Sequence, residues 1–99
     1  MIRGTTPKLE FTLPFDTDSL VEAFVTLTQD GIPIVEKTLK ECERNGKCLS
    51  VRLTQEDTLK LDCKYNTEIQ IRIKTIMGEA LASNIFACDT GRILKDGVI

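Results

Sequence analysis

Apolar and polar side chains alternate strictly along Glu68–Lys74, and this pattern restricts the fold more than any other feature of the sequence. Successive side chains of a β-strand point to opposite faces of its sheet, so a period of two is typical of a strand with one buried face. The isoleucines Ile69, Ile71 and Ile73 are therefore predicted to face a core, with the polar residues between them in solvent. Leu49–Leu53 alternates in the same way and is predicted to be a second strand of this kind.

Two further strands are predicted nearer the start of the chain. Lys8–Leu13 alternates and ends at Pro14, because proline cannot donate to a strand ladder. Val21–Gln29 follows after a connection that contains one helical turn. The expected inner face of this strand is Val21, Ala23, Val25 and Leu27, which leaves Phe24 outside.

Asp30-Gly31 and Asn45-Gly46 are strong signals for two-residue hairpin turns, which require positive φ at both central positions. The first turn predicts a return strand over Ile32–Thr38. Pro33 favours an edge position for that strand, because it removes a backbone donor. The second turn predicts a hairpin that leads into Lys47–Leu53.

The second half of the chain is predicted to contain one helical turn and one more hairpin. Thr54 and Asp57 have the spacing of a capping box, so a short helical turn is expected near residues 54–59, crossing from one sheet to the other. Met77-Gly78 marks the last turn, and Glu79–Cys88 is predicted to return as a strand. Apolar residues on both faces of this strand indicate a central position in its sheet.

Short strands at regular spacing, separated by glycine turns, predict an all-β fold. The expected architecture is an immunoglobulin-like antiparallel β-sandwich of about seven strands, without the tryptophan of antibody domains. We expect a single domain over residues 1–99, with a core over about 8–88, an N-terminal arm over 1–7 and a C-terminal tail over 89–99. The apolar residues of the tail favour docking on this or a neighbouring subunit.

Composition excludes several classes of partner. Thirteen Lys and Arg are interleaved with fifteen Asp and Glu, and there is one Tyr and no Trp, which argues against nucleic-acid binding. The first residues contain no apolar run and no segment is long enough to span a bilayer, so no membrane association is expected. In the cytosol, the four cysteines are expected to stay reduced.

The absence of histidine removes the Ser–His–Asp and Cys–His nucleophile pairs and the commonest metal ligand. Cys42, Cys48, Cys63 and Cys88 lack a Cys-x-x-Cys spacing, so simple thiols are expected, with a scattered four-thiolate metal site as the alternative. A two-residue turn at Asn45-Gly46 would place Cys48 opposite Glu43. This register argues against a disulfide between Cys42 and Cys48.

The carboxylates do not form a recognisable site. Asp16–Asp18 begins like a calcium loop, but Val21 stands where the loop needs glycine, so a turn that caps backbone amides is expected instead. The pairs in Glu56–Asp57 and Glu41–Glu43 are expected in turns or at exposed edges, without shifted pKa values. We therefore expect no catalytic residue, no cofactor and no metal.

Two surfaces are candidates for protein contacts. Phe24 and Pro33, on neighbouring strands, are expected either to form an exposed apolar patch or to pack under a loop. The edge strand over Ile32–Thr38 offers unpaired backbone groups to another strand. In that case Val35→Pro is expected to weaken association and leave the monomer folded.

The order of these features resembles one known family. Leu9–Thr12 leads to Phe15-Asp16 and then to a strand that ends in Gln29–Gly31; Val51–Thr58 and Glu68–Ile73 complete the series. The chain looks like the immunoglobulin-like N-terminal module of baseplate upper proteins of phages that infect Gram-positive bacteria. It also resembles small prophage proteins that begin with a segment like Ile2–Pro7 and end in one like Leu94–Gly97. Baseplate upper proteins continue into a coiled and receptor-binding region, whereas we expect this chain to consist of the one module.

The resemblance implies a non-enzymatic phage or prophage structural or assembly protein, such as a tail or baseplate accessory. Its partners would be other copies of itself or a phage structural protein. It would reside in the cytoplasm of the bacterial host during assembly and then in the virion. The alternative is a standalone bacterial adaptor or carbohydrate-binding module, although one Tyr and four Phe provide little aromatic surface for sugars. An enzyme is the third possibility.

Overall fold

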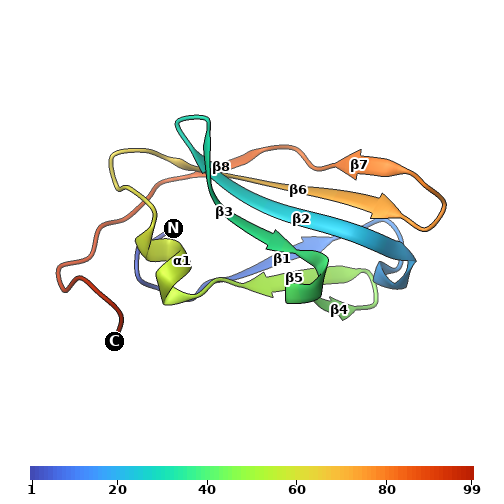
Figure 1. Ribbon diagram of the computed structural model, residues 1–99, viewed down its shortest axis with the longest axis horizontal. Helices are drawn as coiled ribbons and strands as arrows, with labels where there is room; N and C mark the ends of the chain where they lie inside the picture. The colour runs from blue at the N-terminus through green and yellow to red at the C-terminus, as the bar shows by residue number, and fades with distance from the viewer.

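The computed structural model describes all residues, 1–99, and consists of two antiparallel sheets (Figure 1). The strands are β1 (Lys8–Thr12), β2 (Leu20–Gln29), β3 (Ile32–Thr38), β4 (Glu43–Asn45), β5 (Cys48–Arg52), β6 (Thr67–Thr75), β7 (Ala80–Ala82) and β8 (Phe86–Cys88). One α-helix, α1 (Gln55–Leu59), and two 3₁₀ turns, η1 (Thr17–Ser19) and η2 (Leu39–Glu41), make the connections between sheets. The predicted all-β sandwich with one short helix is confirmed.

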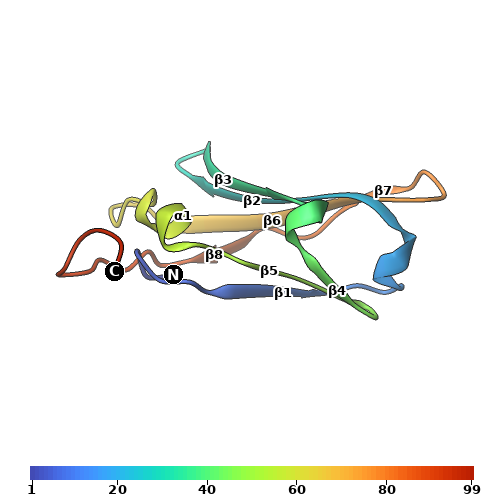
Figure 2. The same cartoon turned by 60° about the horizontal axis from the view of Figure 1, so that its bottom comes forward.

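The order of the strands is that of an immunoglobulin-like domain. One sheet has the order β1-β5-β4, and the other has β3-β2-β6, with β7 and β8 both paired to the outer side of β6. These orders correspond to strands B-E-D and C′-C-F-G of immunoglobulin domains. In Figure 2, β2, β3 and β6 form the upper layer, and β1 and β5 the lower one. No segment takes the place of strand A beside β1.

Apolar side chains from both layers form the core, as the alternating patterns predict. On β6, Ile71 and Ile73 are buried and Ile69 is half-buried. All three apolar residues of Leu49–Leu53 are buried. The complete core cluster is Leu13, Leu20, Ala23, Val25, Leu27, Val35, Leu49, Val51, Leu53, Ile71 and Ile73.

The inner face of β2 differs from the prediction at one residue. Ala23, Val25 and Leu27 are buried, but Val21 is 50% exposed. The pairing of β2 with β6 shifts register between Leu20 and Glu22. Such an irregularity changes which face each side chain meets, so Leu20 is buried in place of Val21.

The first predicted hairpin is confirmed. Asp30 and Gly31 have φ values of 51° and 74°, as a tight turn between antiparallel strands requires. β3 pairs only with β2, so its predicted edge position is confirmed as well. Pro33 lies opposite Thr28, next to a register shift in this ladder.

The second hairpin forms with a different register. Asn45 pairs with Cys48, so Gly46 and Lys47 are the turn residues. Cys48 therefore does not lie opposite Glu43, and that prediction is wrong. The signal at Asn45-Gly46 identified the turn, but Gly46 alone has positive φ, at 59°.

The capping box at the start of α1 is confirmed. Asp57 N donates to Thr54 Oγ1 at 3.1 Å, and Thr54 N donates to Asp57 Oδ2 at 2.8 Å. These bonds satisfy two backbone donors at the helix start. The helix carries the chain from β5 in one sheet to β6 in the other.

The predicted central strand over Glu79–Cys88 is wrong. This segment contains two short strands, β7 and β8, at the edge of the larger sheet. Ile73 pairs with Leu81, whereas Ile69 pairs with Phe86, so one extra residue lies between the two ladders. The extra residue is a β-bulge, and it explains why apolar residues seem to occupy both faces when the sequence is read as one regular strand.

The two arms contact each other at one end of the sandwich. Arg3 N donates to Gly91 O at 3.0 Å, and Gly91 N donates to Met1 O at 2.7 Å. Near the tail's end, Gln55 Nε2 donates to Ile99 O at 3.0 Å. The tail thus contacts its own domain through backbone groups at Gly91 and Ile99, whereas the apolar side chains of Leu94, Val98 and Ile99, which were expected to dock, are exposed. None of the helices is long and apolar enough to cross a membrane.

Candidate functional site

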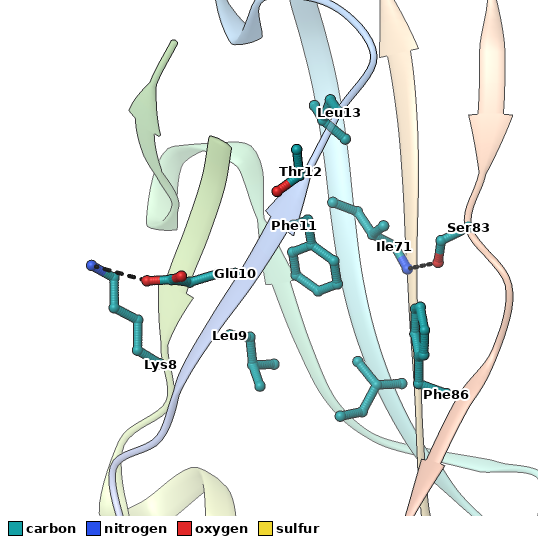
Figure 3. A pocket seen from close by; sticks show the side chains of 10 residues that line it. Lys8, Leu9, Glu10, Phe11, Thr12, Leu13, Ile71, Ser83 and Phe86 are labelled. Carbon is teal, nitrogen blue, oxygen red and sulfur yellow. Dashed lines mark hydrogen bonds and ion pairs between the residues drawn. The ribbon is translucent and has the colours of Figure 1, made fainter. Parts of the chain in front are cut away.

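An apolar groove of about 420 Å³ lies between the free edge of β1 and the outer strands of the larger sheet. Leu9 and Phe11 form one wall, Ile71 lies at the base, and Phe86 stands on the opposite side (Figure 3). Phe86 is 56% exposed, although its partner in the ladder, Ile69, faces inward. The complete lining is Lys8, Leu9, Glu10, Phe11, Thr12, Leu13, Ile69, Ile71, Ser83 and Phe86.

The backbone of β1 has unpaired hydrogen-bonding groups along this groove. Leu53 N donates to Pro7 O at 2.9 Å, and Leu13 N donates to Lys47 O at 2.8 Å. Hydrogen-bonded and non-hydrogen-bonded residue pairs alternate in an antiparallel ladder. The backbone N–H and C=O groups of the odd-numbered residues between these two bonds therefore point to β5. The N–H and C=O groups of the even-numbered residues, Lys8, Glu10 and Thr12, therefore point away from β5, where no strand pairs with them.

The opposite wall is held in place by the bulge between β7 and β8. Ser83 N donates to Ile71 O at 2.9 Å, and Ile71 N donates to Ser83 Oγ at 3.1 Å. Gln70 Nε2 donates to Ser83 O at 3.0 Å. Because Ser83 fixes the bulge to β6, the next strand returns with Phe86 pointing into the groove.

Charged side chains stand on the outer face of β1. Lys8 Nζ and Glu10 Oε1 are 3.9 Å apart, and their side chains are 39% and 62% exposed (Figure 3). An exposed pair of this kind contributes little to stability. It leaves one positive and one negative charge beside the free backbone groups, so the edge has a charge pattern as well as apolar walls.

The four cysteines do not gather into a site. All four are free thiols, and no three His, Cys, Asp or Glu side chains lie close enough together to hold a metal ion. Burial raises the pKa of Cys42, which keeps its thiol protonated at neutral pH. Asp16 accepts from Asp18 N at 2.9 Å and caps η1, as expected for a capping turn.

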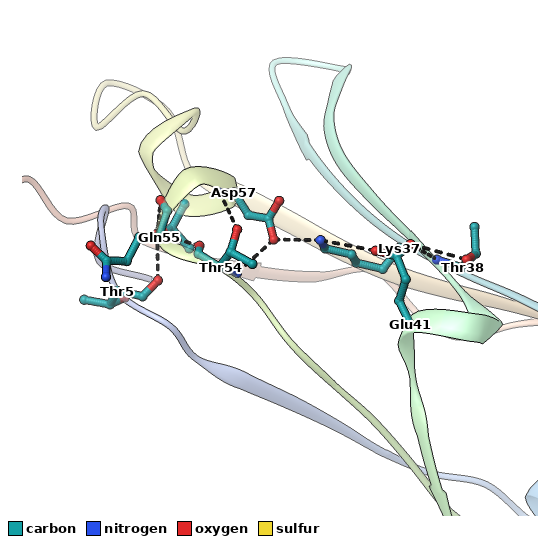
Figure 4. A network of polar contacts seen from close by, with 8 residues as sticks. Thr5, Lys37, Thr38, Glu41, Thr54, Gln55 and Asp57 are labelled. Carbon is teal, nitrogen blue, oxygen red and sulfur yellow. Dashed lines mark hydrogen bonds and ion pairs between the residues drawn. The ribbon is translucent and has the colours of Figure 1, made fainter. Parts of the chain in front are cut away.

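Asp57 and Glu41, expected to be exposed or unperturbed, belong to a polar network with Lys37 (Figure 4). Burial raises the pKa of Asp57, but hydrogen bonds from Lys37 and Thr54 outweigh it, and the pKa lies below its ordinary value of 3.8. The pKa of Glu41 is also lowered, chiefly by the hydrogen bond from Thr38 N. The prediction of unshifted carboxylates is wrong at these two residues. The network joins β3 and η2 to α1 through Lys37.

A buried glutamine at the end of β2 belongs to a second polar network, which the alternating sequence pattern does not predict. Gln29 Nε2 donates to Asp62 O at 2.8 Å, and Asp62 N donates to Gln29 Oε1 at 2.8 Å. The same Nε2 lies 3.2 Å from Thr90 Oγ1, which shares a 2.7 Å hydrogen bond with Thr67 Oγ1. A polar residue at an inward position of β2 was the available signal. The network fixes the loop after α1 to the start of the tail.

Phe24 and Pro33 do not form one apolar patch. Phe24 pairs with Thr38, whereas Pro33 pairs with Thr28, four residues further along β2. At about 3.4 Å per residue, these positions are roughly 14 Å apart. Phe24 is instead half-buried in a hollow beside Leu39.

The groove beside β1 is thus the surface that combines free backbone groups, apolar walls and a defined charge pattern. No family model, no curated protein and no solved structure matches this chain.

Proposed function

We propose that this chain is a non-enzymatic assembly protein of a phage or prophage, a tail or baseplate accessory that acts through protein–protein contacts. The observation that carries the contact mechanism is the free edge of β1 next to an open apolar groove. A strand that joins such an edge gains main-chain hydrogen bonds, and its alternate side chains fill the groove. The proposed contact is therefore the addition of a strand to the smaller sheet.

The phage setting of this proposal follows from the resemblance to baseplate modules. Its partners would be other copies of the chain or a phage structural protein, met in the host cytoplasm and kept in the virion. The edge on β3, considered from the sequence, is a weaker candidate because Val35 is 5% exposed and belongs to the core. Val35→Pro would disturb packing, so it does not separate association from folding.

The groove gives less support to carbohydrate binding. Sugar sites need polar groups that converge on the ligand together with an aromatic platform. Here the Ser83 hydroxyl already accepts from Ile71 N and donates to Asn84 O at 2.8 Å. The remaining wall residues are mainly apolar.

A proline on β1 tests the proposed function. Glu10→Pro removes an outward N–H and leaves the bonds to β5 in place, because the N–H of Glu10 faces away from β5. Phage particles from the encoding host, purified on a density gradient, would be analysed by quantitative mass spectrometry. We expect the wild-type chain at a fixed copy number per particle, at least about tenfold less Glu10→Pro protein, and near-normal amounts of Glu10→Thr, which keeps the N–H.

Circular dichroism of Glu10→Pro would verify that the sandwich is folded. A wild-type chain found only outside the particles would reject the virion role. Equal amounts of both variants in particles would reject β1 as the contact.

A further inference from the structure

We propose that the groove receives one extended strand from a different protein, antiparallel to β1, with apolar residues at every second position. This inference rests on the proposed function and specifies the chemistry of the partner. Three properties lead to it: the place of the groove between the two sheets, the lack of a suitable segment in the two arms of the chain, and the charges on β1.

The strand order limits the groove to a single strand. β1 is the outer strand of its sheet, whereas β7 and β8 lie one position beyond β6 in the other sheet. The groove is lined by β1, by β6 and by Ser83 and Phe86 on the outer side. A single added strand beside β1 would thus lie across from β7 and β8, and β7 and β8 would cover the inward-facing side chains of the added strand.

A second intact copy does not fit this space in the same way. If the β1 strands of two copies paired, each would bring its own β6, β7 and β8 over the shared sheet. Those strands would occupy the space that β7 and β8 of the first copy already fill. The position of β7 and β8 across from this space therefore favours binding of an isolated extended segment rather than the edge strand of another sandwich.

The chain's own arms lack the required pattern. In the tail, Ile93 and Leu94 are adjacent and Lys95 and Asp96 follow, so neither alternate series is apolar throughout. The N-terminal arm is already bonded to Gly91 through Met1 and Arg3. Lys8–Thr12 has apolar residues at every second position, but this segment forms β1 of the folded chain, and the β1 edges of two intact copies do not fit together here. A free strand is therefore expected from another protein.

Charges on β1 specify the register. The outward-facing residues read Thr12, Glu10 and Lys8 in the direction of an antiparallel partner. Opposite charges across a ladder, and threonine opposite threonine, are favourable cross-strand pairs. The matching strand therefore reads Thr-x-Lys-x-Glu, with apolar residues at the intervening positions.

A free peptide with the sequence of residues 6–13, TPKLEFTL, contains this pattern and serves as the probe. Aligned antiparallel to β1, its Lys lies opposite Glu10 and its Glu lies opposite Lys8. Its Pro occupies a position whose N–H would face away from β1, so no ladder bond is lost. The matched control peptide, TPELKFTL, has the same composition with the two charged residues exchanged.

Fluorescence anisotropy at low salt would measure both labelled peptides against the wild-type protein and against the double variant K8E/E10K. We expect the first peptide to bind wild type about tenfold more tightly than the exchanged peptide, from two cross-strand charge pairs. The preference should reverse with K8E/E10K. Glu10→Pro should bind neither peptide, whereas Glu10→Thr should still bind the first.

Equal binding of the two peptides to both proteins would indicate general apolar adhesion and overturn the proposed strand. Absence of binding by either peptide would overturn it as well. A dimer of the protein alone in sedimentation, dissociated by K8E and restored by K8E/E10K, would assign the edge to a second copy and overturn the inference. If neither peptide binds but the protein is incorporated normally into phage particles, the proposed partner strand is rejected and the proposed assembly role is retained.

Discussion

Lys37 Nζ donates to Asp57 Oδ2 at 2.8 Å and so connects β3 of the larger sheet to the helix that follows β5 of the smaller one. Both side chains are nearly buried, at 13% and 11% exposure. Asp57 also accepts from Thr54 N, so one carboxylate holds the helix start and the contact between sheets together (Figure 4). Removal of its charge would therefore weaken both contacts.

Asp57→Asn is expected to lower the free energy of unfolding by about 2 kcal/mol, because the poorly solvated Lys37 ammonium loses its closer charged partner and keeps only the more exposed Glu41 carboxylate, 3.4 Å away. Urea unfolding followed by circular dichroism would measure the change. Glu36→Gln, at an exposed position of the same edge strand, is the matched control and should change stability by less than about 0.5 kcal/mol. Equal effects of the two substitutions would show that the ion pair is not a special contact.

The same network predicts how stability depends on pH. The pKa of Asp57 is depressed in the folded state, so its contribution is present above the ordinary value of 3.8 and is lost as the pH falls through the folded pKa. The hydrogen bond to Asp57 outweighs burial and raises the pKa of Lys37, so that contribution is present below 10.5 and is lost as the pH rises through the folded pKa. Urea midpoints should therefore decline below about pH 4 and above about pH 10.5.

Asp57→Asn should have a shallower acid decline than wild type, because the residue that titrates is gone. A wild-type midpoint that increases on acidification below pH 4 would contradict this assignment.

Leu27→Ala should lower the free energy of unfolding by about 3 kcal/mol, since Leu27 is fully buried between the sheets and its truncation leaves a cavity. Val21→Ala removes a smaller amount of apolar surface from a half-exposed position and should cost less than about 0.5 kcal/mol. The comparison by urea unfolding checks the register of β2 directly. A Val21→Ala effect as large as that of Leu27→Ala would mean that Val21 faces the core.

Gly4→Ala should displace the Ile93 side chain and loosen the C-terminal tail. Gly4 has φ of 73°, and an added Cβ would lie 2.9 Å from Ile93 Cδ1, so the isoleucine must turn away from the arm. Limited trypsin digestion at Arg92 and Lys95 should become several-fold faster. Gly97→Ala is the matched control, because Gly97 also has positive φ, at 90°, but nothing lies near its added Cβ. Equal digestion rates would show that the tail does not depend on this contact.

Strands and their buried faces could be predicted best where one face of the strand is buried and the other is exposed to solvent. Ile71 and Ile73 alternate with exposed Arg72 and Lys74, so period and burial agree, and the turn at Asp30-Gly31 follows from backbone geometry alone. Val21 was misassigned because an irregular pairing beside Leu20 interrupts the period. The local sequence of β2 gives little indication of such a shift, because the shift depends on which residues of β6 lie opposite those of β2.

The groove could not be predicted for a related reason. Leu81 and Phe86 look like residues on opposite faces of one strand, and only the bulge near Ser83 makes both point inward. The free edge of β1 depends on the order of strands in two sheets, which is a long-range property. The charges of Lys8 and Glu10 are evident in the sequence. Only the order of the strands shows that they lie on a free edge, where they can pair with residues of another strand.

The contact between the N-terminal arm and Gly91 has a consequence for attachment. It brings both chain ends to one pole of an elongated molecule, 46 Å in its longest dimension, while the turn at Met77-Gly78 lies at the far pole (Figures 1 and 2). A short linker from Ile99 to Met1 should therefore be tolerated, with new ends opened at Gly78. Fluorescent proteins or affinity handles joined to Met1 or to Ile99 would all emerge from the same pole, and the opposite pole would stay unobstructed.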